Sequence, residues 1–161
     1  MDTKQLQPYN YQAIAPNDFT FTTKHGVNYR AYFLPYGEYT PLYGSIYIFN
    51  LSNINEETHP VDIRISHTVA AILSDFFEEE ENSAVIMCDN SDSKEFKRFK
   101  LFDRWYKKLK DKDVMKLDSA IETDYYSLYI SLFVHNNNPW KNNVIKEYYR
   151  MISEEFTIPE D

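Results

Sequence analysis

A continuous apolar run, followed by a polar turn and a basic amphipathic segment, constrains the fold most strongly. The run covers residues 84–88, the turn covers residues 89–93, and the amphipathic segment covers residues 94–110. An apolar run of this length between turn residues is typical of a strand buried on both faces. We therefore expect strand, loop and helix. The loop is the first place to look for chemistry, because ligands of open α/β sheets bind beyond the carboxyl ends of strands.

The rest of the chain contains further strand-like and helix-like patterns. We expect strands at residues 18–23, 27–34, 45–51, 114–121 and 125–134, with an edge strand near residues 9–14. Apolar residues at helical spacing predict helices at residues 62–80 and 140–155. The first of these helices ends in four glutamates, residues 78–81, which oppose the helix dipole. We therefore expect it to fray there.

The order of these elements predicts a single α+β domain over residues 1–161. Apart from the edge strand, the order is β-β-β-α-β-α-β-β-α. The first three strands are joined by short connections and should pair antiparallel, whereas the strands on either side of the first helix should be parallel through a right-handed crossover. We expect a mixed, mostly antiparallel sheet with helices on its faces. An extended N-terminal arm at residues 1–17 and an acidic tail at residues 156–161 complete the prediction.

Net charge and cysteine content argue against several classes of function. The 161 residues carry a net charge of −8, and an acidic chain binds nucleic-acid phosphates or an anionic membrane poorly. The only cysteine, Cys88, cannot form an intramolecular disulfide, which fits a reducing compartment. The N-terminus lacks the apolar core of a signal peptide, and no apolar run approaches the roughly 20 residues of a membrane span. We expect a cytoplasmic protein without a free nucleic-acid or membrane partner.

The amphipathic segment at residues 94–110 carries the strongest functional signal. It holds eight basic and two acidic residues, so its local charge is +6 inside an acidic chain. Helical spacing predicts an apolar face with Phe99, Phe102, Tyr106 and Leu109. It predicts a basic face with Lys97, Lys100, Arg104, Lys107 and Lys108. Two interpretations stay open, a solvated helix face and a surface that binds an acidic protein partner.

The loop after the buried strand contains Asp89, Asn90 and Asp92. Paired carboxylates at a strand end can hold Mg²⁺, but the same residue types favour turns and helix caps, and we favour the turn. A catalytic Cys88 would need a histidine partner, and the four histidines show no pairing spacing. The sequence contains neither a Cys/His metal motif nor a phosphate-binding glycine loop. We expect a structural cysteine and no metal site.

The same stretch resembles a family. An uncharacterised bacterial family of small cytoplasmic proteins has the signature C-D-x-x-D…R…L-F-D-R-W, which is similar to residues 88–92, Arg98 and residues 101–105 of this chain. The resemblance covers about residues 9–110 and implies no activity, because that family has none to transfer. Two roles stay open for the signature residues, a functional one and the locking of the helix by ion pairs and stacking. They are Asp89, Arg98, Asp103, Arg104 and Trp105.

The order of elements is similar to the core of GNAT-type acetyltransferases. In that family a glycine-rich R/Q-x-x-G-x-G/A loop opens a helix, and its backbone N–H groups bind the pyrophosphate of acetyl-CoA. At the matching place Arg64 fits, whereas His67 and Val69 occupy the glycine positions. Asn90 and Tyr106 would match the family's Asn and its general-acid Tyr. The resemblance implies acetyl-CoA bound by Arg64 and His67, and the missing glycines argue against this activity.

No complete catalytic constellation is present, the body of the chain is acidic, and one helical face is basic. We therefore hypothesise a non-enzymatic protein-interaction module that uses residues 94–110 and no cofactor. One alternative is a divergent, acyl-CoA-dependent N-acyltransferase with GNAT-like topology. Another is a metal-dependent phosphoryl enzyme that uses Asp89 and Asp92. Self-association as a homodimer is a further open prediction.

Overall fold

The computed structural model describes residues 7–36, 45–54, 62–89, 95–122, 124–125 and 127–155. Within these ranges, side chains are described except at positions 45, 88–89, 95–98 and 155. The predictions for Asn90, Asp92, residues 1–6 of the arm and the tail at residues 156–161 concern positions outside this part of the chain.

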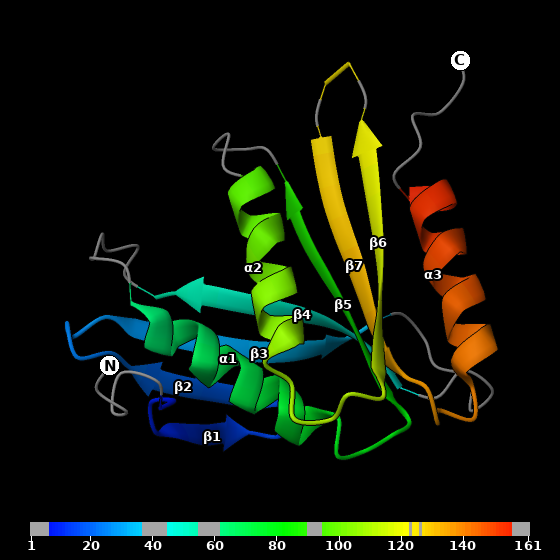
Figure 1. Cartoon of the computed structure of the whole chain (residues 1–161). Helices are drawn as coiled ribbons and strands as arrows, with labels where there is room; N and C mark the ends of the chain where they lie inside the picture. Colours follow the sequence, from blue (N-terminus) through cyan, green and yellow to red (C-terminus); the bar gives the residue numbers. More distant parts are fainter. Residues whose placement is uncertain are drawn as a thin grey trace.

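Seven strands and three helices make up the described part of the chain (Figure 1). The strands are β1 (Tyr11–Ala15), β2 (Asp18–Thr22), β3 (Asn28–Pro35), β4 (Ser45–Asn53), β5 (Asn82–Asp89), β6 (Val114–Glu122) and β7 (Ser127–His135). The helices are α1 (Ile63–Phe76), α2 (Glu95–Lys107) and α3 (Lys141–Glu155). The strands form one sheet in the order β1-β2-β3-β4-β5-β7-β6. The predicted α+β class and element order are confirmed, and the expected edge strand is β1.

β4 and β5 are the parallel pair of this sheet, and every other neighbouring pair is antiparallel. The two strands pair from Ser45 and Asn82 as far as Phe49 and Ile86. β4 then continues along β3 to Asn53, and β5 continues along β7 to its own end. The sheet therefore opens between β4 and β5, and Figure 1 shows the two groups of strands diverging from a common base.

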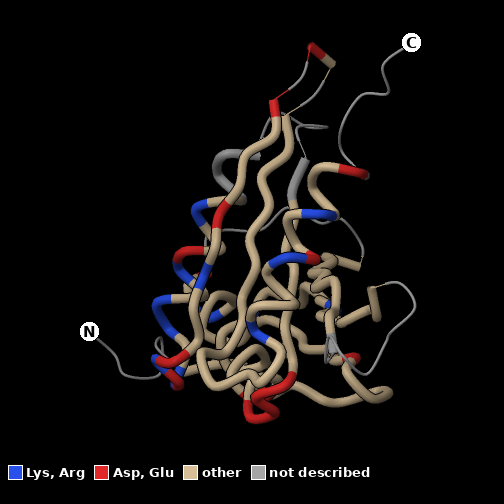
Figure 2. The backbone as a smooth tube through the Cα atoms, turned by 90° about the vertical axis from the view of Figure 1, so that its right-hand side faces the viewer, with Lys and Arg blue, Asp and Glu red and all other residues tan. Residues whose placement is uncertain are grey.

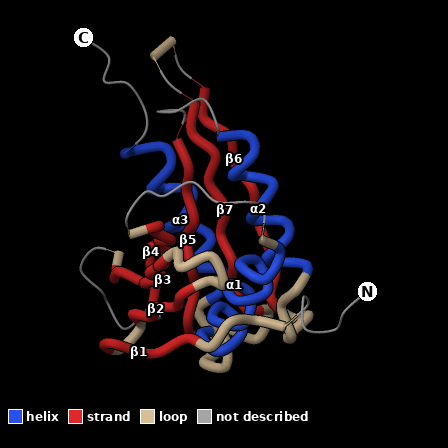
Figure 3. The backbone as a smooth tube through the Cα atoms, turned by 90° about the vertical axis from the view of Figure 1, so that its left-hand side faces the viewer, coloured by secondary structure: helices blue, strands red, loops and turns tan. Residues whose placement is uncertain are grey.

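Helices cover both faces of the sheet. Figure 3 shows α3 on one side and α1 with α2 on the other. Neighbouring residues of a strand point to opposite faces, so Phe133 packs under α1 and α2 while Leu132 packs under α3. In the same way, Ile86 packs on the side of α1 and α2 and Val85 packs on the side of α3, and both are buried. This confirms that the predicted strand forms, and it is buried on both faces over residues 84–86.

α1 ends at Phe76, with Phe77 as its C-cap, before the four glutamates begin. Residues 78–81 are exposed and lie outside the helix, as the unfavourable charge at its C-terminal end predicts. The helix therefore ends where its apolar pattern ends, four residues before the predicted bound of residues 62–80. No helix in the described ranges is both long and apolar enough to cross a membrane.

Candidate functional site

α2 separates an apolar face from a basic face as its sequence predicts. Phe102 is buried, and Leu109, just past the end of the helix, is buried too. Phe99 and Tyr106 are half-buried against the same core. On the opposite face Lys100, Arg104 and Lys107 are exposed, and Lys108 is half-buried. The side chain of Lys97 lies outside the described set. Figure 2 shows the basic positions of α2 in a column along one edge of the molecule.

Two of the signature residues fasten α2 to the sheet. Trp105 is only 4% exposed, and its ring lies edge-on to Phe49 at 5.8 Å between centroids. Asp103 accepts a hydrogen bond from Lys116 on β6 at 2.7 Å. Lys116 also donates to Asp118 at 2.5 Å, and its side chain is 5% exposed. These contacts support the interpretation that Asp103 and Trp105 lock the helix.

Two of the cations on the other face of α2 differ in this respect from Lys116. Arg104 and Lys107 have no ion-pair partner within the described residues. Burial lowers the pKa of Lys108, and the neighbouring charges of Arg104 and Lys107 lower it further. On α1, burial and then the charge of Lys108 lower the pKa of His67. The charge of Lys108 therefore also acts on a side chain of α1. We call Arg104, Lys107 and Lys108 the cationic cluster.

Replacing Lys108 with Met should raise the free energy of unfolding at pH 7 by about 0.5 kcal/mol. The folded state disfavours the charged amine, so its folded pKa lies below the ordinary value of 10.5. As the pH rises, the folded protein loses this proton before the unfolded chain does. The free energy of unfolding of the wild type therefore recovers. The gain from the substitution should therefore shrink toward about pH 10. Urea unfolding at pH 7 and at about pH 10 measures this gain. The control is Lys110→Met, because Lys110 is exposed.

An equal or lower unfolding free energy of Lys108→Met at pH 7 would contradict this account of the cluster. The control matters because a new methionine on the surface changes apolar area as well as charge. Only Lys108→Met should show a gain that depends on pH.

A cavity of about 220 Å³ opens where β4 and β5 diverge. Its walls come from three elements, and they are Phe49, Asn50, Leu51, Ile86, Met87, Leu101, Phe102 and Trp105. The cavity therefore lies at the carboxyl ends of the parallel strands, where ligands bind in open α/β sheets. From the sequence we predicted chemistry in the loop at residues 89–93 and did not predict the cavity. The cavity could have been predicted from the carboxyl end of the strand expected at residues 45–51.

The N-terminal end of α1 is closed by the protein's own side chains. Asp62 caps the helix and accepts a hydrogen bond from the backbone N–H of Arg64 at 3.0 Å. The hydroxyl of Tyr9 also donates to Asp62. The guanidinium of Arg64 lies 3.8 Å from the ring centroid of Tyr9 and donates to the backbone oxygen of Gln7 at 2.9 Å. A carboxylate thus occupies the place where a helix N-terminus would attract a phosphate.

The other residues of the acetyl-CoA prediction are not brought together at that end. His67 is half-buried on α1 and lies near enough to Lys108 for the lysine charge to lower its pKa. Tyr106 lies on the apolar face of α2, with its ring 5.7 Å from that of Phe133. Asp89 ends β5, and its side chain is outside the described set. The metal and turn interpretations of the loop therefore stay predictions. Among the described residues, no three His, Cys, Asp or Glu side chains cluster as metal ligands would.

His135 is 1% exposed and uses both of its ring nitrogens. Its Nε2 lies 2.6 Å from a carboxylate oxygen of Asp111, and its Nδ1 accepts the backbone N–H of Asn137 at 3.0 Å. A general base needs a nitrogen that faces a substrate. This pair therefore has a structural role, because it links the end of β7 to the connection between α2 and β6.

Comparison with known proteins gives one match. A family model, described as a family of unknown function (DUF6169), matches residues 61–150, a range that includes all of α1 and extends into α3. No curated protein and no solved structure matches the chain. The similarity to GNAT-type acetyltransferases and the signature around residues 88–105 therefore stay predictions.

Proposed function

The chain belongs to DUF6169, a family of unknown function, and we propose that it is a non-enzymatic protein-interaction module of the bacterial cytoplasm. The basic face of α2 binds an acidic protein partner, through Lys100 and the cationic cluster. No cofactor takes part in this role. Lys97 belongs to the same predicted face by sequence.

The observation that carries this proposal is the contrast between compensated and uncompensated cations. Arg30 is paired with Asp18 at 2.7 Å, and Lys116 is paired with two carboxylates. The cationic cluster of α2 instead holds like charges against one another, and burial first, then the charges of Arg104 and Lys107, lower the pKa of Lys108. Such an arrangement costs stability when the protein is alone. An acidic partner would relieve the repulsion and gain the charge pairs.

The charge of the whole chain favours a protein partner over nucleic acid. The net charge is −8, so a long polyanion would meet repulsion on most of the surface. A protein with a compact acidic patch needs to approach only the basic face. Charge complementarity of this kind accelerates association and orients the partner.

Reversing Lys100, Arg104 and Lys107 to Glu should weaken the binding of a fluorescein-labelled oligo-glutamate by about tenfold or more, since each exposed ion pair contributes roughly 0.2–1 kcal/mol and repulsion replaces it. Fluorescence anisotropy at low salt measures the affinity. The matched control reverses Lys24, Lys141 and Lys146, three lysines away from α2, and changes the net charge by the same amount.

The control variant should bind the oligo-glutamate within about twofold of the wild type. Equal losses in both variants would show that only net charge matters, and the proposed placement of the interface would then be wrong. Wild-type binding should also fall as salt is added, because exposed charge pairs are screened.

One observation favours a second candidate, a divergent acyl-CoA-dependent N-acyltransferase. The parallel strands separate beyond Phe49 and Ile86, and a cavity lies in the opening. Against it, Asp62 and the arm around Tyr9 occupy the N-terminal end of α1, where the predicted pyrophosphate site would be. Calorimetric titration with acetyl-CoA decides between them. Saturable binding would support the acyltransferase, and a flat trace would leave the interaction module.

A further inference from the structure

Beyond Phe49 and Ile86, β4 and β5 no longer pair with each other. In the part of the chain that the structure describes, the edges that these two strand ends turn toward each other have no ladder partner. Leu51 pairs with β3 and Met87 pairs with β7, so the ladder of each strand continues only on its outer side. Within the described residues, no further strand enters the opening. Backbone N–H and C=O groups alternate along such edges, and they are a template for another extended chain.

The cavity between the two edges suits one apolar side chain. Ile86, Phe102 and Trp105 are buried apolar residues of its wall, and Met87 adds a side chain that adapts to different shapes. Its volume of about 220 Å³ is smaller than the roughly 300–1,000 Å³ of sites that enclose a drug-sized ligand. A single anchoring side chain fits this space better than a whole nucleotide-containing cofactor.

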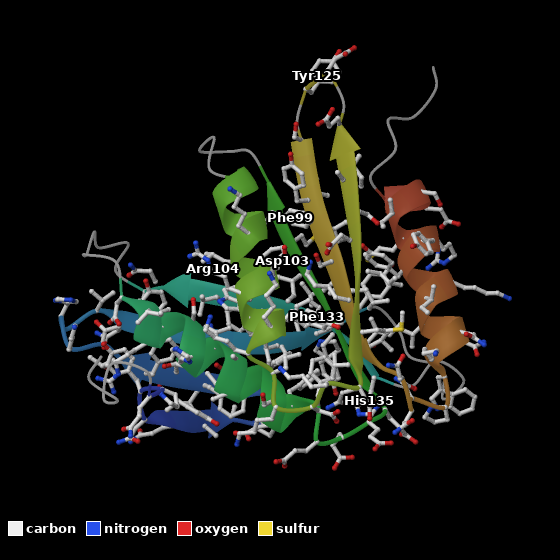
Figure 4. All side chains as sticks on the ribbon, viewed as in Figure 1. Phe99, Asp103, Arg104, Tyr125, Phe133 and His135 are labelled. Carbon is white, nitrogen blue, oxygen red and sulfur yellow. The ribbon has the colours of Figure 1, made fainter. Side chains whose placement is uncertain are left out.

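Two members of the cationic cluster flank this cavity along α2. Arg104 lies three positions after the cavity residue Leu101, and Lys108 lies three positions after Trp105. Residues three apart are neighbours on a helix surface, so each cation lies beside a cavity residue along α2 and the turn at its C-terminal end. Figure 4 shows Arg104 on the side of α2 that faces away from β6 and β7. An apolar cavity beside two cations is complementary to an apolar side chain flanked by carboxylates.

We propose that the acidic partner inserts an extended segment of its chain between the ends of β4 and β5. The backbone of the segment hydrogen-bonds to the two strand edges, one apolar side chain fills the cavity, and neighbouring carboxylates pair with Arg104 and Lys108. An extended segment is required because a helix uses its backbone groups internally. This inference rests on the proposed function, since it specifies the partner's binding element at the same face.

The test uses synthetic peptides and the tryptophan in the cavity wall. The chain has two tryptophans, and Trp140→Phe leaves Trp105 as the only reporter. Trp140 packs in the other core, so its replacement leaves the cavity intact. The probe is a capped pentapeptide with leucine between two pairs of glutamates. It is compared with the same peptide carrying glycine in place of leucine, an N-methylated leucine, or lysines in place of the glutamates.

The leucine peptide should shift the Trp105 fluorescence and bind roughly tenfold tighter than the glycine peptide, because one apolar side chain is buried. The N-methylated peptide should bind more weakly than its parent, since a backbone N–H is lost. The lysine peptide should show no saturable shift.

Each other outcome overturns a defined part of the account. The leucine, glycine and N-methylated peptides could bind equally well, and this binding could be lost when Lys100, Arg104 and Lys107 are reversed. That result would overturn the strand insertion but would support the basic interface. Saturable binding of the lysine peptide would overturn the acidic partner and leave the cavity as an anchor site. Failure of every peptide to bind would overturn both. Leu101→Phe, which narrows the cavity without adding a second tryptophan, should abolish the preference for leucine over glycine and keep binding dependent on charge.

Discussion

Trp105→Ala is expected to lower the free energy of unfolding by about 3–5 kcal/mol. The indole is 4% exposed and packs against Phe49 and Phe102, with ring centroids 5.8 and 5.6 Å away. It also forms part of a cavity wall, so its removal enlarges a space that the structure can only partly fill by relaxation. Urea unfolding followed by far-UV circular dichroism measures the loss.

Trp140→Ala is the matched control for this experiment, because Trp140 is only partly buried and packs in the other core. Its loss of stability should be clearly smaller. If Trp105→Ala unfolded within about 1 kcal/mol of the wild type while binding was lost, the role of Trp105 would be limited to contacting the partner, and it would not be the packing residue described above.

Removing both carboxylates that pair with Lys116 should lower the free energy of unfolding by about 3 kcal/mol or more. The Lys116 side chain is 5% exposed, and Asp103 and Asp118 hold its ammonium group at 2.7 and 2.5 Å. In the variant Asp103→Ala with Asp118→Ala, the charge stays nearly buried without a partner. The neighbouring Phe99 ring, 5.3 Å from the nitrogen, supplies only a weak cation–π contact.

Adding Lys116→Met to that double variant should recover most of the lost stability, because the charge that needs compensation is gone. Thermal unfolding of the double and triple variants gives the comparison. A triple variant as unstable as the double one would contradict the account, since the loss would then come from the aspartates themselves.

Local sequence patterns were sufficient to predict the pairing directions from β2 to β5. The alternation in β2 and β3 and the short connection between them indicated an antiparallel pair, and a helix between β4 and β5 required a parallel one. The spacing of Phe99, Phe102 and Leu109 gave the buried side of α2, and the cations followed on the other side. These features depend on residues close together in the chain.

The features that the sequence did not predict depend on residues far apart. Tyr9 lies 53 positions before Asp62 in the chain, and its hydroxyl donates to this N-cap carboxylate and covers the start of α1. Lys116 falls in the strand predicted at residues 114–121, and only the packing of β6 against α2 buries it beside Asp103. The cavity exists because β3 and β7 keep their pairing with β4 and β5 after the central pair has ended. No local pattern encodes where that pairing stops.

The most direct test of the basic interface is a backbone amide chemical-shift titration of the ¹⁵N-labelled protein with oligo-glutamate. The account predicts the largest shift changes along residues 100–108 of α2 and its C-terminal end, with smaller ones at the start of α1 and little change on α3. Changes spread over α3 or the β1 edge, with α2 unaffected, would contradict the claim that the basic face of α2 is the binding surface.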